Sequence, residues 1–382
     1  MNRSCIRILR ISCLHPLDYL EKEKDKNSEF VQSSSFDEYQ EWLYSLKIYN
    51  SDFYTDYLTR LGYKTLEVFT NDSAYVNKLC DKLLNARQGV IQKIKRRLIQ
   101  PKYNLFFLFS LLINELDPQI IFVHDPSGVD HNYWRNYKHN RLIVTKVNCH
   151  FSHVCNFNPT YPDVIITRLE SYEKFFKVNG TPTYKLPDGI DDRMQYEYNE
   201  CKEHTVTFIG ILGTKIHSER TLALERLAKH TNLSWYGPSN DNKFINVSNT
   251  SPLRSAYKGV TGGIDMFSIY NSSLICINDF ANLTMRDGTN QRTAEILGSN
   301  SCLLIRDYPS IQDDLPDSTY ISYSSNEELI DRVKWLVGHP DECKRIAQNG
   351  YRFARENLSY SKICTKMDEV FRHHLKAKGI FD

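Results

Sequence analysis

The feature that most constrains the fold of this chain is the alternation of short aliphatic and β-branched runs with longer helical patterns. Such alternation is typical of β–α–β units, in which helices cover both faces of a parallel sheet. In the first half the predicted strands are 6–11, 65–69, 120–124, 142–147, 164–167 and 183–186. In the second half they are 205–209, 233–236, 274–277, 302–305 and 320–323. Because the pattern occurs twice, we predict an α/β protein with two Rossmann-like, doubly wound parallel-sheet domains.

Helical patterns fill the intervals between these runs. In the first half they lie at about 51–62, 73–99, 103–116, 131–139 and 170–178, and in the second at about 217–230, 252–258, 265–270, 290–298, 326–337 and 340–356. The polar segment 21–35, which contains Glu-Lys-Glu-Lys-Asp-Lys, is expected to be a surface loop.

A length of 382 residues suits about two or three domains. The predicted units are an N-terminal, acceptor-binding domain at 1–190, a charged hinge at 191–203, a C-terminal, nucleotide-sugar-binding domain at 204–358 and a last segment at 359–382. The amphipathic helix of that segment, 359–377, could pack back on the N-terminal domain.

Composition excludes several classes of function. Forty-eight Lys and Arg against 46 Asp and Glu give a net charge of +2, so no nucleic-acid partner is predicted. The ten Cys form no CxxC pair and no Cys/His cluster at zinc spacing. Reduced thiols, no metal and a cytoplasmic location are therefore expected.

Membrane association is predicted to be peripheral if it occurs. The apolar stretch from Leu105 to Ile113 is about half as long as a membrane span requires. The basic, amphipathic run 92–109 could lie on the anionic inner face of a membrane, where lipid-linked acceptors are found. The alternative is a surface helix that continues into a buried one, with Pro101 between them.

Ligands of doubly wound sheets bind beyond the carboxyl ends of the strands. The predicted strand 205–209 is followed by Gly210 and Gly213, with Lys215 and Arg220 near the start of a helix. Small residues, a helix N-terminus and basic side chains can hold a diphosphate. The alternative is a plain turn, since neither GxxxxGK[ST] nor GxGxxG is present.

The segment 285–307 carries the strongest signal. A turn leads into a helix N-terminus, which presents N–H donors to a phosphate, and a carboxylate one to two turns later can bind ribose hydroxyls. The candidate donor-site residues are Asp287, Thr289, Asn290, Arg292 and Glu295. The alternative is a surface ion pair between Arg292 and Glu295, with Asp287 as a turn former.

In the N-terminal half, His124 and Asp125 follow an apolar strand, and His150 and His153 follow the next one. Groups at these strand ends face the cleft between the domains. His124 or Asp125 could orient or deprotonate the hydroxyl of an acceptor. The alternative is a capping Asp and a partly buried, hydrogen-bonded His.

Several motifs together resemble a known family. They are TFIG, HSER, WYG, GGIDMFSIYNSSLICIN, NQRTAEILGSNSCLLIRD and HPDECKRIAQNGYRFAREN. They look like the C-terminal domain of group 1 glycosyltransferases of the GT-B fold, and are most similar to the divergent CgeB-like branch. The resemblance covers roughly 200–375 well and 1–190 only by pattern.

This resemblance implies a nucleotide-sugar donor in the C-terminal domain and a glycan or glycoconjugate acceptor in the N-terminal one. Related retaining enzymes carry a Glu-x7-Glu element, whose positions correspond here to Asp287 and Glu295. Glu295 would then bind the ribose, and Asp287 would contact the donor sugar as a catalytic residue, with one methylene less reach than Glu. The WYG motif adds Gly237 to the donor site, and the basic candidates for the diphosphate are Lys215, Arg220 and Arg292.

Glycosyl transfer needs fixed positive charge beside the leaving diphosphate, which Arg and Lys supply without a metal. No DxD pair follows a strand, so we predict a metal-independent glycosyltransferase without a cofactor. The Asp287/Glu295 resemblance favours retention of configuration, whereas a base on the far face would favour inversion. The alternatives are an epimerase of the non-hydrolysing type and a non-catalytic nucleotide-sugar or glycan-binding protein.

Overall fold

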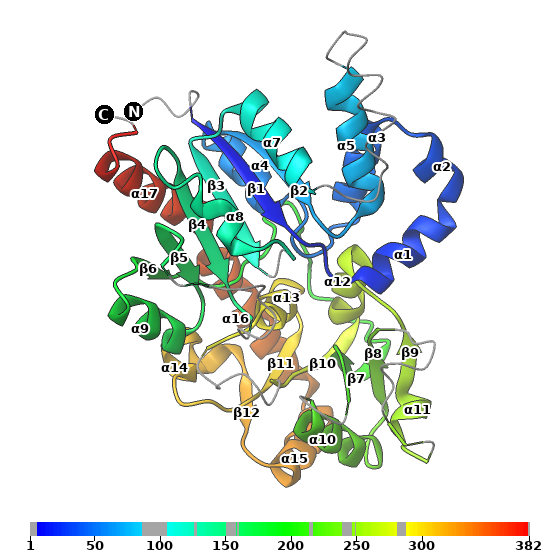
Figure 1. Cartoon of the computed structure of the whole chain (residues 1–382). Coiled ribbons are helices and arrows are strands. Elements are labelled where there is room, and N and C mark those ends of the chain that lie inside the picture. The colour runs from blue at the N-terminus through cyan, green and yellow to red at the C-terminus, as the bar shows by residue number, and fades with distance from the viewer. Residues whose placement is uncertain are drawn as a thin grey trace.

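The computed structural model describes residues 6–85, 105–125, 128–149, 158, 160–213, 217–238, 247–248, 250–280 and 288–380. Two six-stranded parallel sheets form within them, each flanked by helices (Figure 1). Hydrophobic cores lie on the faces of both sheets. The predicted fold class, two Rossmann-like doubly wound domains, is confirmed.

The first sheet has the strand order β2-β1-β3-β4-β5-β6. Its strands are β1 (Arg7–Ser12), β2 (Lys64–Phe69), β3 (Ile120–Asp125), β4 (Leu142–Val147), β5 (Val164–Thr167) and β6 (Thr183–Lys185). The helices of this half are α1 (Leu17–Lys26), α2 (Ser28–Ser33), α3 (Phe36–Ser45), α4 (Phe53–Arg60), α5 (Ser73–Asn85), α7 (Leu105–Leu116), α8 (His131–Arg135) and α9 (Glu170–Val178).

The second sheet has the order β12-β11-β10-β7-β8-β9. Its strands are β7 (His204–Ile209), β8 (Leu233–Tyr236), β9 (Tyr257–Gly259), β10 (Ser273–Asn278), β11 (Cys302–Arg306) and β12 (Ile321–Tyr323). The helices are α10 (Ser218–Ala228), α11 (Leu253–Ala256), α12 (Gly263–Asn271), α13 (Gln291–Gly298), α14 (Ile311–Asp314), the 3-10 turn η3 (Asp317–Thr319), α15 (Asn326–Val337) and α16 (Pro340–Asn357).

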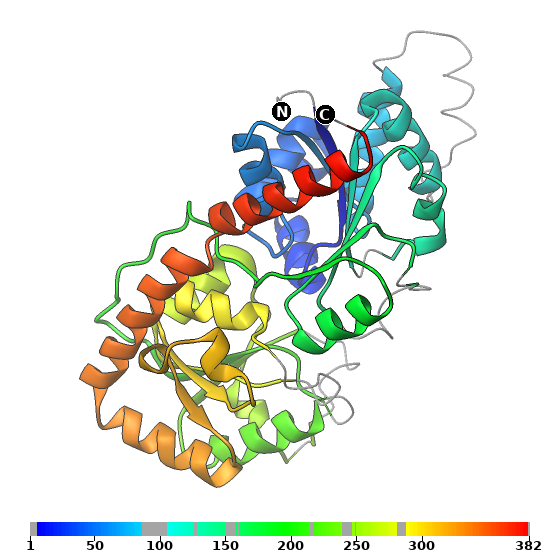
Figure 2. The ribbon, with the colours of Figure 1, turned by 90° about the vertical axis from the view of Figure 1, so that its left-hand side faces the viewer.

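The last helix, α17 (Tyr360–Ala377), crosses from the second domain to the first (Figure 2). Its apolar face is buried against the first sheet, where it completes a core that includes Ile8, Phe122 and Val144. The buried residues of this face are Tyr360, Ile363, Cys364, Met367, Val370, Phe371 and Leu375. The C-terminal helix is thus part of the N-terminal core.

Two local expectations are wrong, and one helix was not predicted. The expected loop 21–35 is occupied by α1 and α2, because Glu and Lys are good helix formers and ion pairs such as Lys26–Glu23 (2.6 Å) support the helix. The patterns did not predict α3, whose capping box joins Ser35 and Glu38. Only Leu253–Ala256 of the expected helix 252–258 is helical, and the next residues form the edge strand β9.

Candidate functional site

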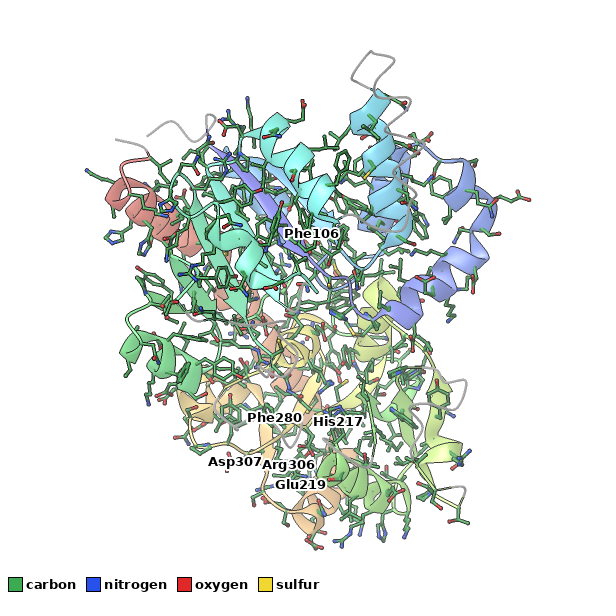
Figure 3. All side chains as sticks on the ribbon, viewed as in Figure 1. Phe106, His217, Glu219, Phe280, Arg306 and Asp307 are labelled. Carbon is green, nitrogen blue, oxygen red and sulfur yellow. The ribbon has the colours of Figure 1, made fainter. Side chains whose placement is uncertain are left out.

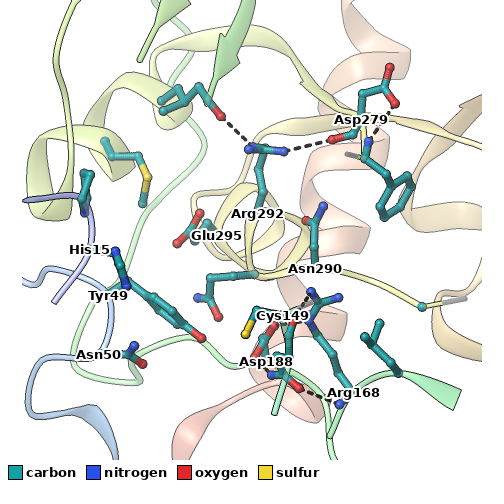
Figure 4. Close-up of a pocket in the computed structure, with 18 of the residues that line it drawn as sticks. His15, Tyr49, Asn50, Cys149, Arg168, Asp188, Asp279, Asn290, Arg292 and Glu295 are labelled. Carbon is teal, nitrogen blue, oxygen red and sulfur yellow. Dashed lines mark hydrogen bonds and ion pairs between the residues drawn. The ribbon is translucent and has the colours of Figure 1, made fainter. Parts of the chain in front are cut away.

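A cavity of about 430 Å³ lies between the two domains. The carboxyl ends of strands from both sheets meet there, where doubly wound folds bind ligands. From the first domain it is lined by residues that include His15, Tyr49, Asn50, His124, Asn148, Arg168 and Asp188. From the second it is lined by residues that include Ile209, Arg220, Tyr270, Asp279, Asn290, Arg292 and Glu295 (Figure 4).

Arg292, the second residue of α13, is held by the ends of two strands. Its Nε donates to the carbonyl oxygen of Ile209 at 2.6 Å, and its Nη1 donates to the carbonyl oxygen of Asp279 at 3.2 Å. Nη1 also donates to Oδ1 of Asn278 at 3.0 Å. The guanidinium is therefore fixed at the carboxyl ends of β7 and β10 by neutral acceptors.

Arg220 of α10 lies beside it. Its Nη1 donates to the same carbonyl oxygen of Asp279 at 3.1 Å, and its Nη2 donates to the carbonyl oxygen of Ile211. Both guanidiniums lie near the ring of Phe208, at 5.0 Å for Arg292 and 5.3 Å for Arg220. Burial and the charge of Arg292 lower the pKa of Arg220 to about 9.

The carboxylates nearby are engaged with other cations. Asp279 pairs with Arg306 at 2.7 Å in the second domain, where Figure 3 labels Arg306 and Phe280. Asp188 pairs with Lys146 at 2.8 Å and with Arg168 at 2.9 Å. Among the described residues, no carboxylate forms an ion pair with Arg220 or Arg292. Arg220, which is buried, and Arg292, which is partly buried, therefore leave positive charge at the cavity wall.

Glu295 lies one turn after Arg292 on α13 and lines the same cavity. Burial raises the pKa of its carboxyl group to about 7, although Arg292 and a hydrogen bond with Gln291 act in the opposite direction. The negative charge of Asp188 adds to the increase. This carboxyl group can therefore exchange a proton near neutral pH.

The sequence patterns missed Asn278, the last residue of β10 and fully buried. Its amide exchanges two hydrogen bonds of 3.0 Å with the amide of Asn290, the N-cap of α13. It also donates to Oγ1 of Thr293 at 2.8 Å. Asn278 thus aligns the N-terminus of α13 with Arg292. The sequence does contain one signal for this role, because Asn278 is a polar residue at the end of an apolar strand.

Four predicted donor-site residues are not among those that line the cavity: Gly210, Gly213, Gly237 and Thr289. A Cβ on Gly210 would overlap the guanidinium of Arg292. A Cβ on Gly237 would lie 2.7 Å from the carbonyl oxygen of Gly210. The backbone of Gly213 is bound to the Thr221 hydroxyl at 2.9 Å. Gly210 and Gly237 therefore permit close packing around Arg292.

The structure brings four of the predicted donor-site residues to one cavity wall, Arg220, Asn290, Arg292 and Glu295, with His124 on the facing domain. Thr289 uses its carbonyl oxygen to accept from Arg168 of the first domain. Lys215, Asp287, His150 and His153 lie outside the described residues, as does most of 92–109, and only the backbone of Asp125 is described.

His124 is 2% exposed, and its Nδ1 is 3.3 Å from Nη2 of the buried Arg10. Burial lowers the pKa of His124 well below its ordinary value, and the charges of Lys146 and Arg10 lower it further. The imidazole is therefore neutral at physiological pH.

The described part of the chain contains neither a membrane-spanning helix nor a cluster of metal ligands. None of the described helices is both long and apolar enough to cross a bilayer. In the same part of the chain, no three His, Cys, Asp or Glu side chains are grouped as metal ligands.

Comparison with known proteins gives a family match for part of the chain and a fold match for nearly all of it. Residues 220–369 match the family described as glycosyl transferase-like. None of the curated proteins matches the sequence.

Solved structures are similar in fold at low sequence identity. A glycosyltransferase from Rickettsia africae has 12% identity and a TM-score of 0.57, and the match covers 97% of this chain and 99% of that one. AviGT4, a glycosyltransferase involved in avilamycin A biosynthesis, has 12% identity and a TM-score of 0.55, covering 97% and 98%. Anabaena Alr3699/HepE in complex with UDP-glucose has 9% identity and a TM-score of 0.52, covering 84% and 88%.

Proposed function

Since this chain has the GT-B fold of glycosyltransferases and its residues 220–369 match a glycosyltransferase family, we propose that it transfers a sugar from a nucleoside diphosphate to a hydroxyl group of a glycan or glycoconjugate. The observation that carries the proposal is the pair of arginines at the cavity wall, the buried Arg220 and the partly buried Arg292, which lack a carboxylate partner among the described residues. The CgeB-like branch stays a prediction.

The chemistry of the leaving group explains why such a pair is suitable. When the bond between the sugar and the diphosphate breaks, its electron pair stays on the diphosphate. Two guanidiniums and the N–H groups at the start of α13 would stabilise this charge in a partly dry cleft. They are held in advance by Phe208, Asn278 and backbone carbonyl groups, so little reorganisation is needed. We therefore propose metal-independent transfer.

We also propose that configuration is retained. Among the described residues, Asp188 is the one carboxylate that lines the cavity from the first domain, and Lys146 and Arg168 neutralise it. It is poorly suited to deprotonate an acceptor on the far face of the sugar. In a retaining transfer the acceptor oxygen bonds to the anomeric carbon on the face that the diphosphate leaves, and the acceptor proton passes to the diphosphate.

A thermal-shift screen with UDP, GDP, dTDP, ADP and CMP tests the donor site. We expect one nucleoside diphosphate to raise Tm, and Arg292→Gln to weaken its binding by about ten- to a hundredfold, as expected for losing a charge-assisted hydrogen bond. Arg226→Gln is the matched control, because Arg226 is exposed on α10 and pairs with Glu327. A folded sample that responds to no nucleotide would contradict the proposal.

Turnover of the selected donor sugar then tests catalysis and metal dependence. Transfer or hydrolysis should continue unchanged in EDTA. Activity that EDTA abolishes and Mg²⁺ or Mn²⁺ restores would contradict metal independence. Binding without turnover would support a non-catalytic binding protein instead.

A further inference from the structure

The protonation state of His124 follows from its neighbour in the core of the first domain. Nη2 of Arg10 lies 3.3 Å from Nδ1 of His124. A guanidinium can only donate hydrogen bonds, so Nδ1 must accept. A neutral imidazole whose Nδ1 accepts carries its proton on Nε2, which is on the opposite side of the ring from Arg10. His124 lines the cavity, and no other described residue is hydrogen-bonded to its Nε2.

Arg10 is itself fixed by a buried ion pair. Its Nη1 donates to Oε2 of Glu67 at 2.6 Å, and both side chains are fully buried. The two residues are register partners on β1 and β2. Oε1 of Glu67 also accepts from Ser12 at 2.8 Å, and Arg10 lies 4.9 Å from the centre of the Tyr54 ring. The guanidinium therefore has one orientation, with Nη2 toward His124.

Stability alone does not explain such a pair. Replacing a buried ion pair by apolar residues of similar size is often neutral or stabilising, because desolvation offsets the attraction. A charged pair inside the sheet of a nucleotide-binding fold, one residue of which contacts a side chain of the cleft, is better explained by that contact.

The surroundings of the ring favour the neutral form. Lys146 of β4, Arg10 of β1 and His15 after β1 all carry or can carry positive charge, and each disfavours an imidazolium. The aromatic rings of Phe122, Tyr49 and Tyr54 lie next to the imidazole, with centroids between 5.9 and 6.5 Å away. Among the side chains that the structure describes, no carboxylate is one of the groups that shift the pKa of this ring.

We propose that His124 is a fixed hydrogen-bond donor to a hydroxyl oxygen of the donor sugar through its Nε2–H, and that Arg10 and Glu67 are positioning residues that hold it in this tautomer. The inference rests on the proposed function for the identity of the ligand. The sugar is favoured over the acceptor because His124 shares one cavity of about 430 Å³ with Arg220 and Arg292, room for about one nucleotide sugar. His124 is then not the catalytic base.

Nitrogen NMR of the ¹⁵N-labelled whole chain tests the tautomer without any assay of activity. We expect the proton on Nε2 and a neutral ring from about pH 6 to about pH 8, a range in which an ordinary histidine titrates. In the double variant Arg10→Gln/Glu67→Gln, which keeps polar side chains and removes both charges, both tautomers should appear and the pKa of His124 should rise. A proton on Nδ1, or an imidazolium at neutral pH, in the wild type would overturn the proposal.

Two further measurements test the ligand. UDP-glucose should move the Nε2–H resonance, and UDP at saturation should not. For hydrolysis of UDP-glucose without an acceptor, His124→Ala should lower kcat/KM by about tenfold or more, the loss expected for one hydrogen bond. His124→Gln should regain most of it, because the amide reaches the position of Nε2 but cannot act as a base.

The outcomes separate this inference from the function on which it rests. If His124→Gln is as slow as His124→Ala, or if saturating UDP-glucose leaves the resonance unmoved, the donor role is wrong. If no nucleotide binds in the thermal-shift screen, the proposed function fails, while the NMR spectrum still reports whether Arg10 fixes the tautomer.

Discussion

At the scale of single residues, the partner of each buried charge decides whether that charge remains available to a ligand. Asp188 and Asp279 line the cavity but are bound to Lys146 and Arg306. Arg220 is as deeply buried as these residues and has only carbonyl oxygens as hydrogen-bond acceptors. Residue type alone does not show which charge is available, because Lys146, Arg306 and Arg220 are all buried cations, and among the described residues only the first two pair with a carboxylate.

Glu295 provides a prediction about pH. Its pKa of about 7 in the folded protein lies above the ordinary value of 4.5, so between these pH values the folded state binds a proton that the unfolded state has released. Stability must therefore fall as the pH rises through this window. Glu295→Gln should abolish the decrease, which amounts to about 3 kcal/mol at most.

The measurement is the free energy of unfolding by denaturant, without nucleotide, below and above this window. Glu327→Gln is the control, because Glu327 is exposed on α15. An equal pH dependence in the wild type and in Glu295→Gln would show that this carboxyl group is ionised throughout.

At the scale of elements, α13 and α17 differ in how far the sequence predicts them. For both helices the bounds follow from periodicity and caps, with Asn290 and Ser359 at the N-cap positions. The hydrogen-bond acceptors of Arg292 do not follow from these local signals, because they lie at the ends of β7 and β10, which only the folded sheet brings side by side. The amphipathic pattern of α17 does not indicate which domain the helix covers either.

Packing of α17 can be tested with Phe371, which is fully buried near Tyr63 and Phe122 at ring distances of 6.3 Å. Phe371→Ala should destabilise the first domain by about 3–5 kcal/mol through lost burial and a cavity. Lys366→Ala on the exposed side of α17 is the control. Hydrogen exchange should locate the loss in the first sheet. A loss confined to the second sheet would contradict this role of α17.

At the scale of the whole molecule, contacts on opposite sides of the cavity join the domains. On one side, the backbone N–H of Ile264 in α12 donates to the carbonyl oxygen of Leu46 at 3.0 Å. On the other, Lys185 of β6 pairs with Asp314 of α14 at 3.1 Å. These contacts hold the two domains together, so that the residues of both domains line one cavity.

Gly263 makes the first of these contacts possible. Its φ of +50° suits glycine, and a Cβ there would overlap the carbonyl group of Leu46. Gly263→Ala should therefore separate the domains on this side, with a lower Tm and a larger radius of gyration by X-ray scattering. Gly338→Ala is the control, because its nearest atoms would be at an ordinary 3.5 Å. Unchanged scattering and Tm in Gly263→Ala would contradict a tight interdomain contact.

Hydrophobic periodicity and caps predict all of the described strands except β9, most helices and the doubly wound class, because they are local properties of the chain. The sequence patterns also singled out Arg220, Asn290, Arg292 and Glu295, because they lie near the start of a helix that follows a strand, and all four line the cavity. The tertiary structure alone decided which charges are neutralised, which nitrogen of His124 carries the proton and where α17 packs. Each of these depends on partners brought together by folding, such as Arg10 and His124, which are 114 positions apart.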